Sequence, residues 1–279
     1  MAMQATARAI MSPDSNPPEP LLLKPPLKWA GGKRWLVPYI EPIWREHRSR
    51  RYVEPFCGGL AVAFGLQPER AVLNDINPHL INFYRQVRRG LSLTIKARYH
   101  RELFYKQRDR FNDLIRGGWA FTKEAAQLFY YLNRTCYNGL CRFNRNGEFN
   151  VPFGRYKTVN YLTEFDDYRE LFLGWSFENR DVEQLHIERG DFIYADPPYD
   201  VQFTTYNAGG FSWDDQVRTA EWLAKHRGPV VLSNQATKRI VKLYRDLKFD
   251  VKFVAGPRRI SCTGDRKAVR EVLASRNLG

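Results

Sequence analysis

RYVEPFCGGLAVAFGLQPERAVLNDINPHLINFYRQV, residues 51–87, contains two short apolar runs that each stop at an acid. The first run ends at Glu54 and leads into a glycine turn and a helix-like segment. The second ends at Asp75 and is followed by an Asn-Pro pair that is typical of a helix start. Strand, turn, helix, strand and acid, in this order, indicate the beginning of a parallel α/β sheet. The sequence therefore predicts an α/β protein.

The same alternation continues on both sides of this stretch and is interrupted once. Helices are expected over residues 36–47, 221–227 and 240–247, and apolar strands near residues 191–195, 229–234 and 248–256. In between, the chain is rich in Arg, Tyr, Phe and Asn. It is helical in pattern at first and then carries the turn signals YNG and RNG, which favour a hairpin or a long loop.

This change in pattern divides the chain into parts. We expect one discontinuous α/β domain formed by residues 21–88 and 176–279. Residues 89–175 are expected to be a mainly helical insertion that carries a hairpin. Residues 1–20 are expected to be a flexible tail without the features of a secretory signal.

Composition points to a chain with a real core and a polyanionic partner. Of its 279 residues 43% are hydrophobic, and no apolar run approaches the roughly 18 residues that would cross a bilayer. Lys and Arg number 44 against 30 Asp and Glu, a net charge of +14. Such an excess favours nucleic acid, since each neutralised phosphate releases counterions; solubility alone is the alternative. No basic amphipathic stretch indicates a membrane surface.

The cysteines do not form a metal site or a disulfide framework by their spacing. The four cysteines, at positions 57, 136, 141 and 262, contain no CxxC pair, and the five histidines do not cluster near them. We therefore expect no metal, ordinary thiols, and a reducing, cytoplasmic setting.

The glycine turn at residues 55–59, PFCGG, is a candidate ligand site. Glycines allow a ligand to approach the backbone, and Asp75, at the end of the next strand, is well placed to accept hydrogen bonds from a ribose. A phosphate-binding loop fails in detail, because Gly32-Lys33 is followed by Arg34 instead of Ser or Thr. The dinucleotide motif GxGxxG is also absent. An adenosine-bearing ligand without a pyrophosphate fits best.

Residues 196–199, DPPY, end an apolar run with a second candidate site. Two prolines cannot continue a sheet. Asp196 and the carbonyl of Pro197 can accept hydrogen bonds from an amino group, and Tyr199 can stack on a planar ring. Two acceptors that hold both N–H bonds of an exocyclic amine would orient its lone pair for attack on an electrophile. The alternative is a capped strand end with the tyrosine as core filler. Since no Pro-Cys dipeptide occurs, the covalent route to a pyrimidine carbon has no obvious nucleophile.

The ordered set of motifs resembles a known family. LKWAGGK, EPFCGGLAV, NDIN, NRTCYNGLCRFNRNGEFNVPFGRYK and DPPY occur in the order found in the Dam-like adenine-N6 DNA methyltransferases of the D12 class. The resemblance runs from about residue 27 to residue 273. It implies a Rossmann-like sheet that uses S-adenosylmethionine, with an inserted target-recognition domain, and double-stranded DNA as partner without an obligate protein partner.

The resemblance also implies roles for individual residues. Those that resemble the family's contacts to S-adenosylmethionine are Trp29, Lys33, Phe56, Asp75, Asp181, Val182 and Asp196. Those that resemble the grip on a flipped-out target adenine are Asp196, Pro197 and Tyr199. Those that resemble residues entering or reading the duplex are Lys28, Tyr137, Asn138, Leu140, Arg142 and Pro152. Because the last set matches members that read GATC, we expect GATC as the site.

Some alternatives stay open at this stage. Trp29 could be a core residue, and Arg142 could contact phosphate without specifying sequence. In FSWDDQVRTA, Gln216 stands where the family usually carries His, which leaves the role of that position open. The competing functions are an amino-methyltransferase that acts on RNA or on a protein glutamine, and a catalytically silent DNA-binding relative.

Overall fold

The computed structural model describes residues 23–200, 210–256 and 270–279, so the expected tail at residues 1–20 lies outside the described residues. The described helices of four residues or more are α1 (Val37–His47), α2 (Ala61–Leu66), α3 (Pro78–Arg88), α4 (Arg101–Arg116), α5 (Lys123–Thr135), α6 (Asp166–Phe172), α7 (Trp213–Lys225) and α8 (Lys238–Asp246). The strands are β1 (Tyr52–Glu54), β2 (Ala71–Asn74), β3 (Trp175–Glu178), β4 (Phe192–Ala195), β5 (Val230–Gln235), β6 (Asp250–Ala255) and β7 (Arg270–Arg276). Short 3₁₀ turns are η1 (Arg34–Leu36), η2 (Tyr137–Gly139) and η3 (Val182–Gln184).

The strands form one seven-stranded sheet in the order β3-β2-β1-β4-β5-β7-β6. β3, β2, β1, β4 and β5 pair in parallel, whereas β7 runs antiparallel between β5 and β6. The α/β fold expected from the sequence is confirmed, with a mostly parallel, Rossmann-like sheet. The strand order reverses between β1 and β4, and in open α/β sheets ligands bind in the crevice outside the carboxyl ends of the strands at such a point.

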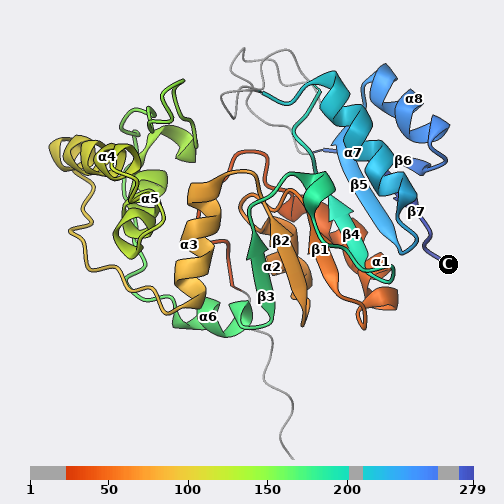
Figure 1. Ribbon diagram of the computed structural model, residues 1–279, viewed down its shortest axis with the longest axis horizontal. Helices are drawn as coiled ribbons and strands as arrows, with labels where there is room; N and C mark the ends of the chain where they lie inside the picture. The colour runs from red at the N-terminus through yellow and green to blue at the C-terminus, as the bar shows by residue number, and fades with distance from the viewer. Residues whose placement is uncertain (1–22, 201–209, 257–269) are drawn as a thin grey trace, which may run out of the picture.

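Both faces of the sheet are covered by helices (Figure 1). Along β4, Phe192 and Tyr194 pack with α1, α2 and α3 in one hydrophobic cluster, while Ile193 and Ala195 pack with α7 and α8 in another. This alternation follows from the two-residue period of a strand, and a strand buried on both faces is apolar throughout. The ends of β1 and β4 are therefore held rigidly from both sides.

The inserted segment lies to one side of the sheet, with α4 and α5 beyond α3 (Figure 1). It leaves and re-enters the α/β body at one neck, where Ser92 pairs with Glu164 and the Leu93 N–H donates to the Thr163 carbonyl at 2.7 Å. Phe143 pairs with Phe149 across a tight turn, so the RNG signal does form a small hairpin. Within the described residues, no helix is long and apolar enough to span a bilayer.

Candidate functional site

The PFCGG turn after β1 is shaped by Trp29. Gly58 has φ +43°, and a Cβ on Gly59 would lie 2.6 Å from Trp29 Cβ, so the indole side chain packs directly on the two glycines. The buried Tyr84 hydroxyl, on α3, donates a hydrogen bond to the Gly58 carbonyl at 2.7 Å. Only glycine permits so close an approach together with a positive φ. Trp29 thus covers the turn.

Asp75 follows β2 and is half-buried beside this turn. Its two carboxylate oxygens accept hydrogen bonds from the Gly58 N–H at 3.0 Å and the Asn77 N–H at 2.9 Å. Burial nevertheless raises the pKa of Asp75 to about 6, because the loss of hydration outweighs these two bonds. An ionised carboxylate is well suited to accept hydrogen bonds from ribose hydroxyls, but Asp75 does not line the pocket described below, so its expected contact with the cofactor stays a prediction.

This pKa leads to a pH dependence of cofactor binding. Ionised Asp75 is the better acceptor, so we expect the affinity for S-adenosylmethionine to fall as the pH drops through about 6, by up to about tenfold per pH unit. Titration calorimetry at several pH values between 8 and 5 measures it. In Asp75→Asn, binding should be weaker throughout and lack this step; an unchanged step in that variant would assign the proton to another group.

A pocket lies next to the turn at the carboxyl end of the sheet, and it brings together three of the residues expected at the cofactor, Phe56, Asp181 and Val182. Its other lining residues are Pro55, Asn74, Ile76, Arg180, Pro198, Gly210, Phe211, Asp215 and Arg218. Asp181 caps the start of η3, where its carboxylate accepts a hydrogen bond from the Glu183 N–H at 3.1 Å. The pocket combines apolar walls with the carboxylate acceptors of Asp181 and Asp215, which suit the faces and the exocyclic amine of an adenine ring.

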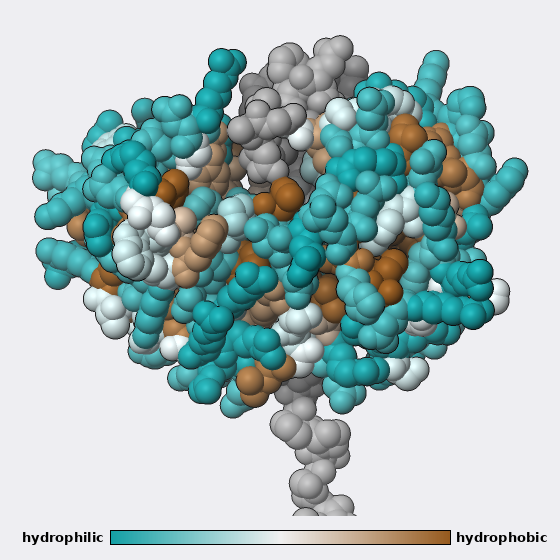
Figure 2. Space-filling model, in the orientation of Figure 1, coloured by the Kyte–Doolittle hydropathy of each residue, from teal (hydrophilic) through white to brown (hydrophobic). Residues whose placement is uncertain are grey.

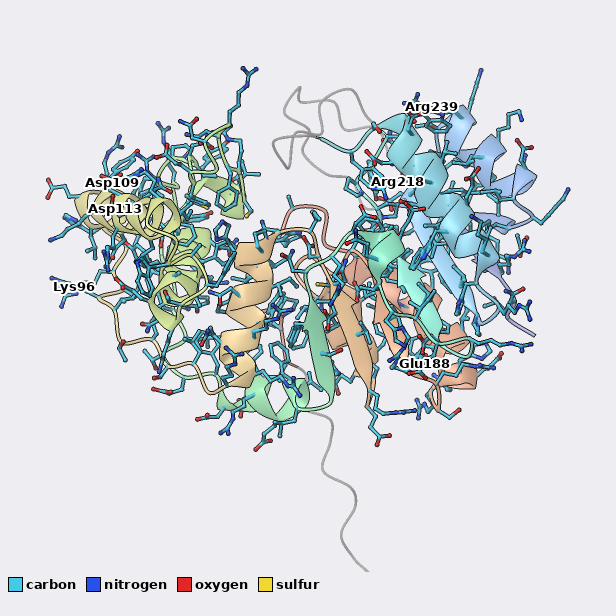
Figure 3. The ribbon with its side chains drawn as sticks, viewed as in Figure 1. Lys96, Asp109, Asp113, Glu188, Arg218 and Arg239 are labelled. Atoms are coloured by element: carbon cyan, nitrogen blue, oxygen red, sulfur yellow. The ribbon has the colours of Figure 1, made fainter. Side chains whose placement is uncertain are left out.

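Arg218 is a residue of this pocket that the sequence analysis missed. Its guanidinium donates to both carboxylate oxygens of Asp181, at 2.7 and 2.8 Å, and to Asp215 at 2.8 Å. These bonds lower the pKa of Asp181 and fix its carboxylate. Figure 3 shows Arg218 on α7. No local motif marks it, because its partner Asp181 is far away in the sequence.

The DPPY segment follows β4 and contains a buried ion pair. Lys33 Nζ lies 2.9 Å from Asp196 Oδ2 and 4.4 Å from the centre of the Tyr199 ring, and Lys33 is 3% exposed. Lys33 therefore contacts the DPPY segment, and Trp29 contacts the glycine turn. Neither residue lines the pocket around Phe56. The expected contacts to cofactor at these two positions stay predictions.

A hydroxyl relay supports the other oxygen of Asp196. Ser233 Oγ donates to Asp196 Oδ1 at 2.8 Å, and the Tyr194 hydroxyl lies 2.9 Å from the same Ser233 oxygen. Since the Ser233 hydrogen is committed to the carboxylate, Tyr194 is the donor in the second bond. Neither residue belongs to a motif that the sequence analysis singled out.

The residues expected to meet DNA gather on the inserted segment and next to it. Tyr137 and Asn138, in η2, are exposed, and Tyr137 N–H donates to the Pro152 carbonyl at 2.9 Å. Arg142 Nε donates to Asn150 Oδ1 at 2.8 Å, which holds the exposed guanidinium at the base of the hairpin. Leu140 is half-buried and Pro152 is exposed.

Lys28 joins this surface to the α/β body. Its Nζ donates to the Arg134 carbonyl at 2.9 Å and lies 3.4 Å from the centre of the Tyr156 ring. Burial, followed by the charge of Arg134, lowers the pKa of Lys28. The backbone N–H and carbonyl of Lys28 both bond the Asn133 side-chain amide, at 2.9 and 2.8 Å. Lys28 and Trp29 therefore run directly from the expected DNA surface to the glycine turn.

Comparison with known proteins identifies the family. Residues 29–257 match the family of D12 class N6 adenine-specific DNA methyltransferases. The chain is 34% identical over 279 aligned residues to the type II methyltransferase M.MjaIII of Methanocaldococcus jannaschii, covering 88% of this chain and 95% of that protein. It is 35% identical over 272 residues to a DNA adenine methylase of Vibrio cholerae, covering 89% and 94%. With the retron Ec67 DNA adenine methylase of Escherichia coli the identity is 34% over 266 residues, covering 89% and 90%. Fold, motif order and these similarities agree, and the chain belongs to the D12 class of N6 adenine-specific DNA methyltransferases.

Proposed function

We propose that this enzyme transfers a methyl group from S-adenosylmethionine to N6 of adenine at GATC in double-stranded DNA. In this proposal the reaction needs no metal and no obligate protein partner. The enzyme acts on DNA in the cytoplasm of a bacterial or phage-infected cell. In this proposal residues 21–88 and 176–279 form the catalytic domain and residues 89–175 read the target.

The observation that carries the proposal is that the pocket around Phe56 and the DPPY segment share a wall. Pro198 lines the same pocket as Phe56 and Asp181. A cofactor whose adenosine occupies this pocket therefore ends close to Asp196 and Tyr199. Donor and acceptor meet at the carboxyl ends of β1 and β4, where the strand order reverses.

The cofactor contributes an electrophilic methyl group on a sulfonium. Asp196 and the Pro197 carbonyl hold the target amine, and Tyr199 stacks on the extruded base. The Lys33 ammonium, 2.9 Å from Asp196 and 4.4 Å from the Tyr199 ring centre, supports this role. A positively charged N–H donor lies against both groups, and positive charge of this kind develops on N6 during transfer. The proton leaves late, to solvent.

The relatives support the substrate and leave the site to be tested. Several matching proteins are named DNA adenine methylases, which favours DNA over RNA or protein as substrate. Modification-sensitive sequencing of plasmid DNA from a methylation-deficient host that expresses the enzyme is the test. Methyladenine confined to GATC is the expected result. Methyladenine at another motif would keep the reaction and refute the site. No modified base, despite binding of cofactor and duplex, would refute the DNA substrate and favour RNA, protein or a silent relative.

Arg142 is the residue we expect to specify the sequence. Its guanidinium is oriented by Asn150, and an arginine fork suits O6 and N7 of guanine. Arg142→Ala should therefore relax discrimination between GATC and sites with one altered base by about 1–3 kcal/mol. Competition binding and methylation rates on a set of singly altered duplexes measure this effect.

Arg145 provides the matched control. It is exposed in the turn of the same hairpin, and its replacement by alanine removes the same charge. Arg145→Ala should weaken binding to all sequences about equally. If Arg142→Ala behaves in the same way, with a shallower salt dependence, then Arg142 contacts phosphate and does not read a base.

A further inference from the structure

Gln216 is a buried amide that contacts the backbone of the DPPY segment. It lies in the first turns of α7 and is 2% exposed. Its Nε2 donates to the Pro198 carbonyl at 2.6 Å. Asn234, on β5 and fully buried, donates from Nδ2 to Gln216 Oε1 at 3.0 Å. The amide thus links the central sheet to the segment that we propose holds the target adenine.

The direction of these hydrogen bonds is fixed from both ends. The Gln235 backbone N–H can only donate, and it bonds Asn234 Oδ1 at 2.8 Å. Asn234 must therefore donate from its Nδ2 to Gln216, and Gln216 must accept this hydrogen bond with its Oε1. The carbonyl of Pro198 can only accept. Asn234 to Gln216 to Pro198 is consequently a one-way chain, and a side chain at position 216 must accept on one side and donate on the other.

The DPPY segment needs such a donor. Neither Pro197 nor Pro198 has a backbone N–H, so the sheet hydrogen bonding that holds β4 stops before the residues that act. Asp196 is held by Lys33 and Ser233 through its side chain, whereas the Pro198 backbone is held by Gln216. Pro198 lies between the expected acceptor of Pro197 and the ring of Tyr199, and it also lines the cofactor pocket.

We propose that Gln216 is a positioning residue for methyl transfer: it fixes the Pro198 carbonyl, and with it the Pro197 acceptor and the Tyr199 ring. This inference rests on the proposed function of the DPPY segment. Because Gln216 touches neither expected substrate, its loss should slow the chemical step and leave binding intact. A displacement of reacting groups by a fraction of an ångström is costly in rate.

The test compares three substitutions at this position. Gln216→Leu removes both hydrogen bonds, and we expect kcat to fall about 10- to 100-fold, with KM values for cofactor and duplex within about threefold of wild type. Gln216→Glu keeps the shape but sets an oxygen against the Pro198 carbonyl, and should lose at least as much. Gln216→His restores one donor and one acceptor at similar spacing, and should recover most of the rate near pH 8, where the imidazole is neutral.

Thr219→Val is the matched control on the same helix. Thr219 is 1% exposed and its hydroxyl has no hydrogen-bond partner among the described residues, so this change tests the packing of α7 alone and should keep the wild-type rate. Should Gln216→Leu fold poorly, the comparison of Gln216→Glu with Gln216→His decides, since both keep a polar group of similar size.

The outcomes separate this inference from the function on which it rests. If wild-type enzyme transfers no methyl group to duplex DNA, the proposed function fails and the inference fails with it. If wild type is active and Gln216→Leu matches Thr219→Val in kcat, the function stands and the inference is overturned. Equal losses in Gln216→His and Gln216→Glu would overturn it as well, because the donor and acceptor order would then be irrelevant.

Discussion

Asp196→Ala should abolish methyl transfer, by at least about 1,000-fold in kcat, while duplex binding stays near the wild-type level. The carboxylate is the only charged acceptor in the DPPY segment, and nothing in an alanine can hold the N6 amine. The change also leaves the buried Lys33 ammonium without the partner that lies 2.9 Å away. Transfer of labelled methyl groups to a GATC duplex and gel-shift affinity measure the two quantities.

Asp200→Ala is the matched control, because it removes the carboxylate that directly follows the DPPY segment. Asp200 forms an ion pair with Arg239 on α8, which Figure 3 labels. It does not pair with Lys33. We expect this variant to keep most of the wild-type rate. If Asp196→Ala loses duplex binding as strongly as it loses transfer, then Asp196 supports the DNA surface and its assignment to the target amine is wrong.

Gly59→Ala should disrupt the site from the opposite side. The added Cβ would lie 2.6 Å from Trp29 Cβ and 3.9 Å from Trp29 Cα, so no rotation of the indole can relieve the clash. The backbone around Trp29 must move, and this segment carries Lys28 on one side and Lys33 on the other. Overpacking of this kind costs about 1–3 kcal/mol, and we expect cofactor affinity to fall by at least about tenfold.

Gly32→Ala is the appropriate comparison, because its added Cβ would make ordinary contacts, 3.6 Å from the Trp29 carbonyl oxygen and 3.8 Å from Ala61 Cβ. Calorimetric titration of each variant with S-adenosylmethionine, together with its melting temperature, separates binding from folding. Near-wild-type affinity in Gly59→Ala would mean that Trp29 packs on the turn without shaping the cofactor site.

The sequence predicts the elements of this fold better than their partners. β1, β2, β4, β5 and β6 were expected, because each has an apolar run with turn signals at its ends. β3 was missed because Trp175–Glu178 is short and follows an irregular stretch, and β7 because it lies beside residues 257–269, where no alternation was recognised. The position of β7 between β5 and β6 depends on pairing between distant segments, which no local pattern encodes.

The same distinction holds for the candidate site. The residues that were expected stand in motifs at strand ends, where local sequence and chemistry coincide. Arg218, Ser233 and Gln216 were missed, or left without a role, because their partners Asp181, Asp196 and Pro198 lie 18 to 37 positions away. Such residues support the acting groups through tertiary contacts, and they can be found only once the chain is folded.

Figure 2 also shows a largely hydrophilic face, in keeping with a charge excess spread over much of the chain.

Since we propose that the inserted segment reads the target, its neck, where the Leu93 N–H donates to the Thr163 carbonyl, bears on how such an enzyme could acquire a new target sequence. A segment whose two ends are adjacent can be exchanged between relatives without altering the order of the sheet strands. The exchange is not unrestricted, because α5 packs along α3, and α3 in turn contacts α6 and β3. A functional chimera should therefore inherit the α3 face together with the segment that it supports, and recombination that divides these two helices should be selected against.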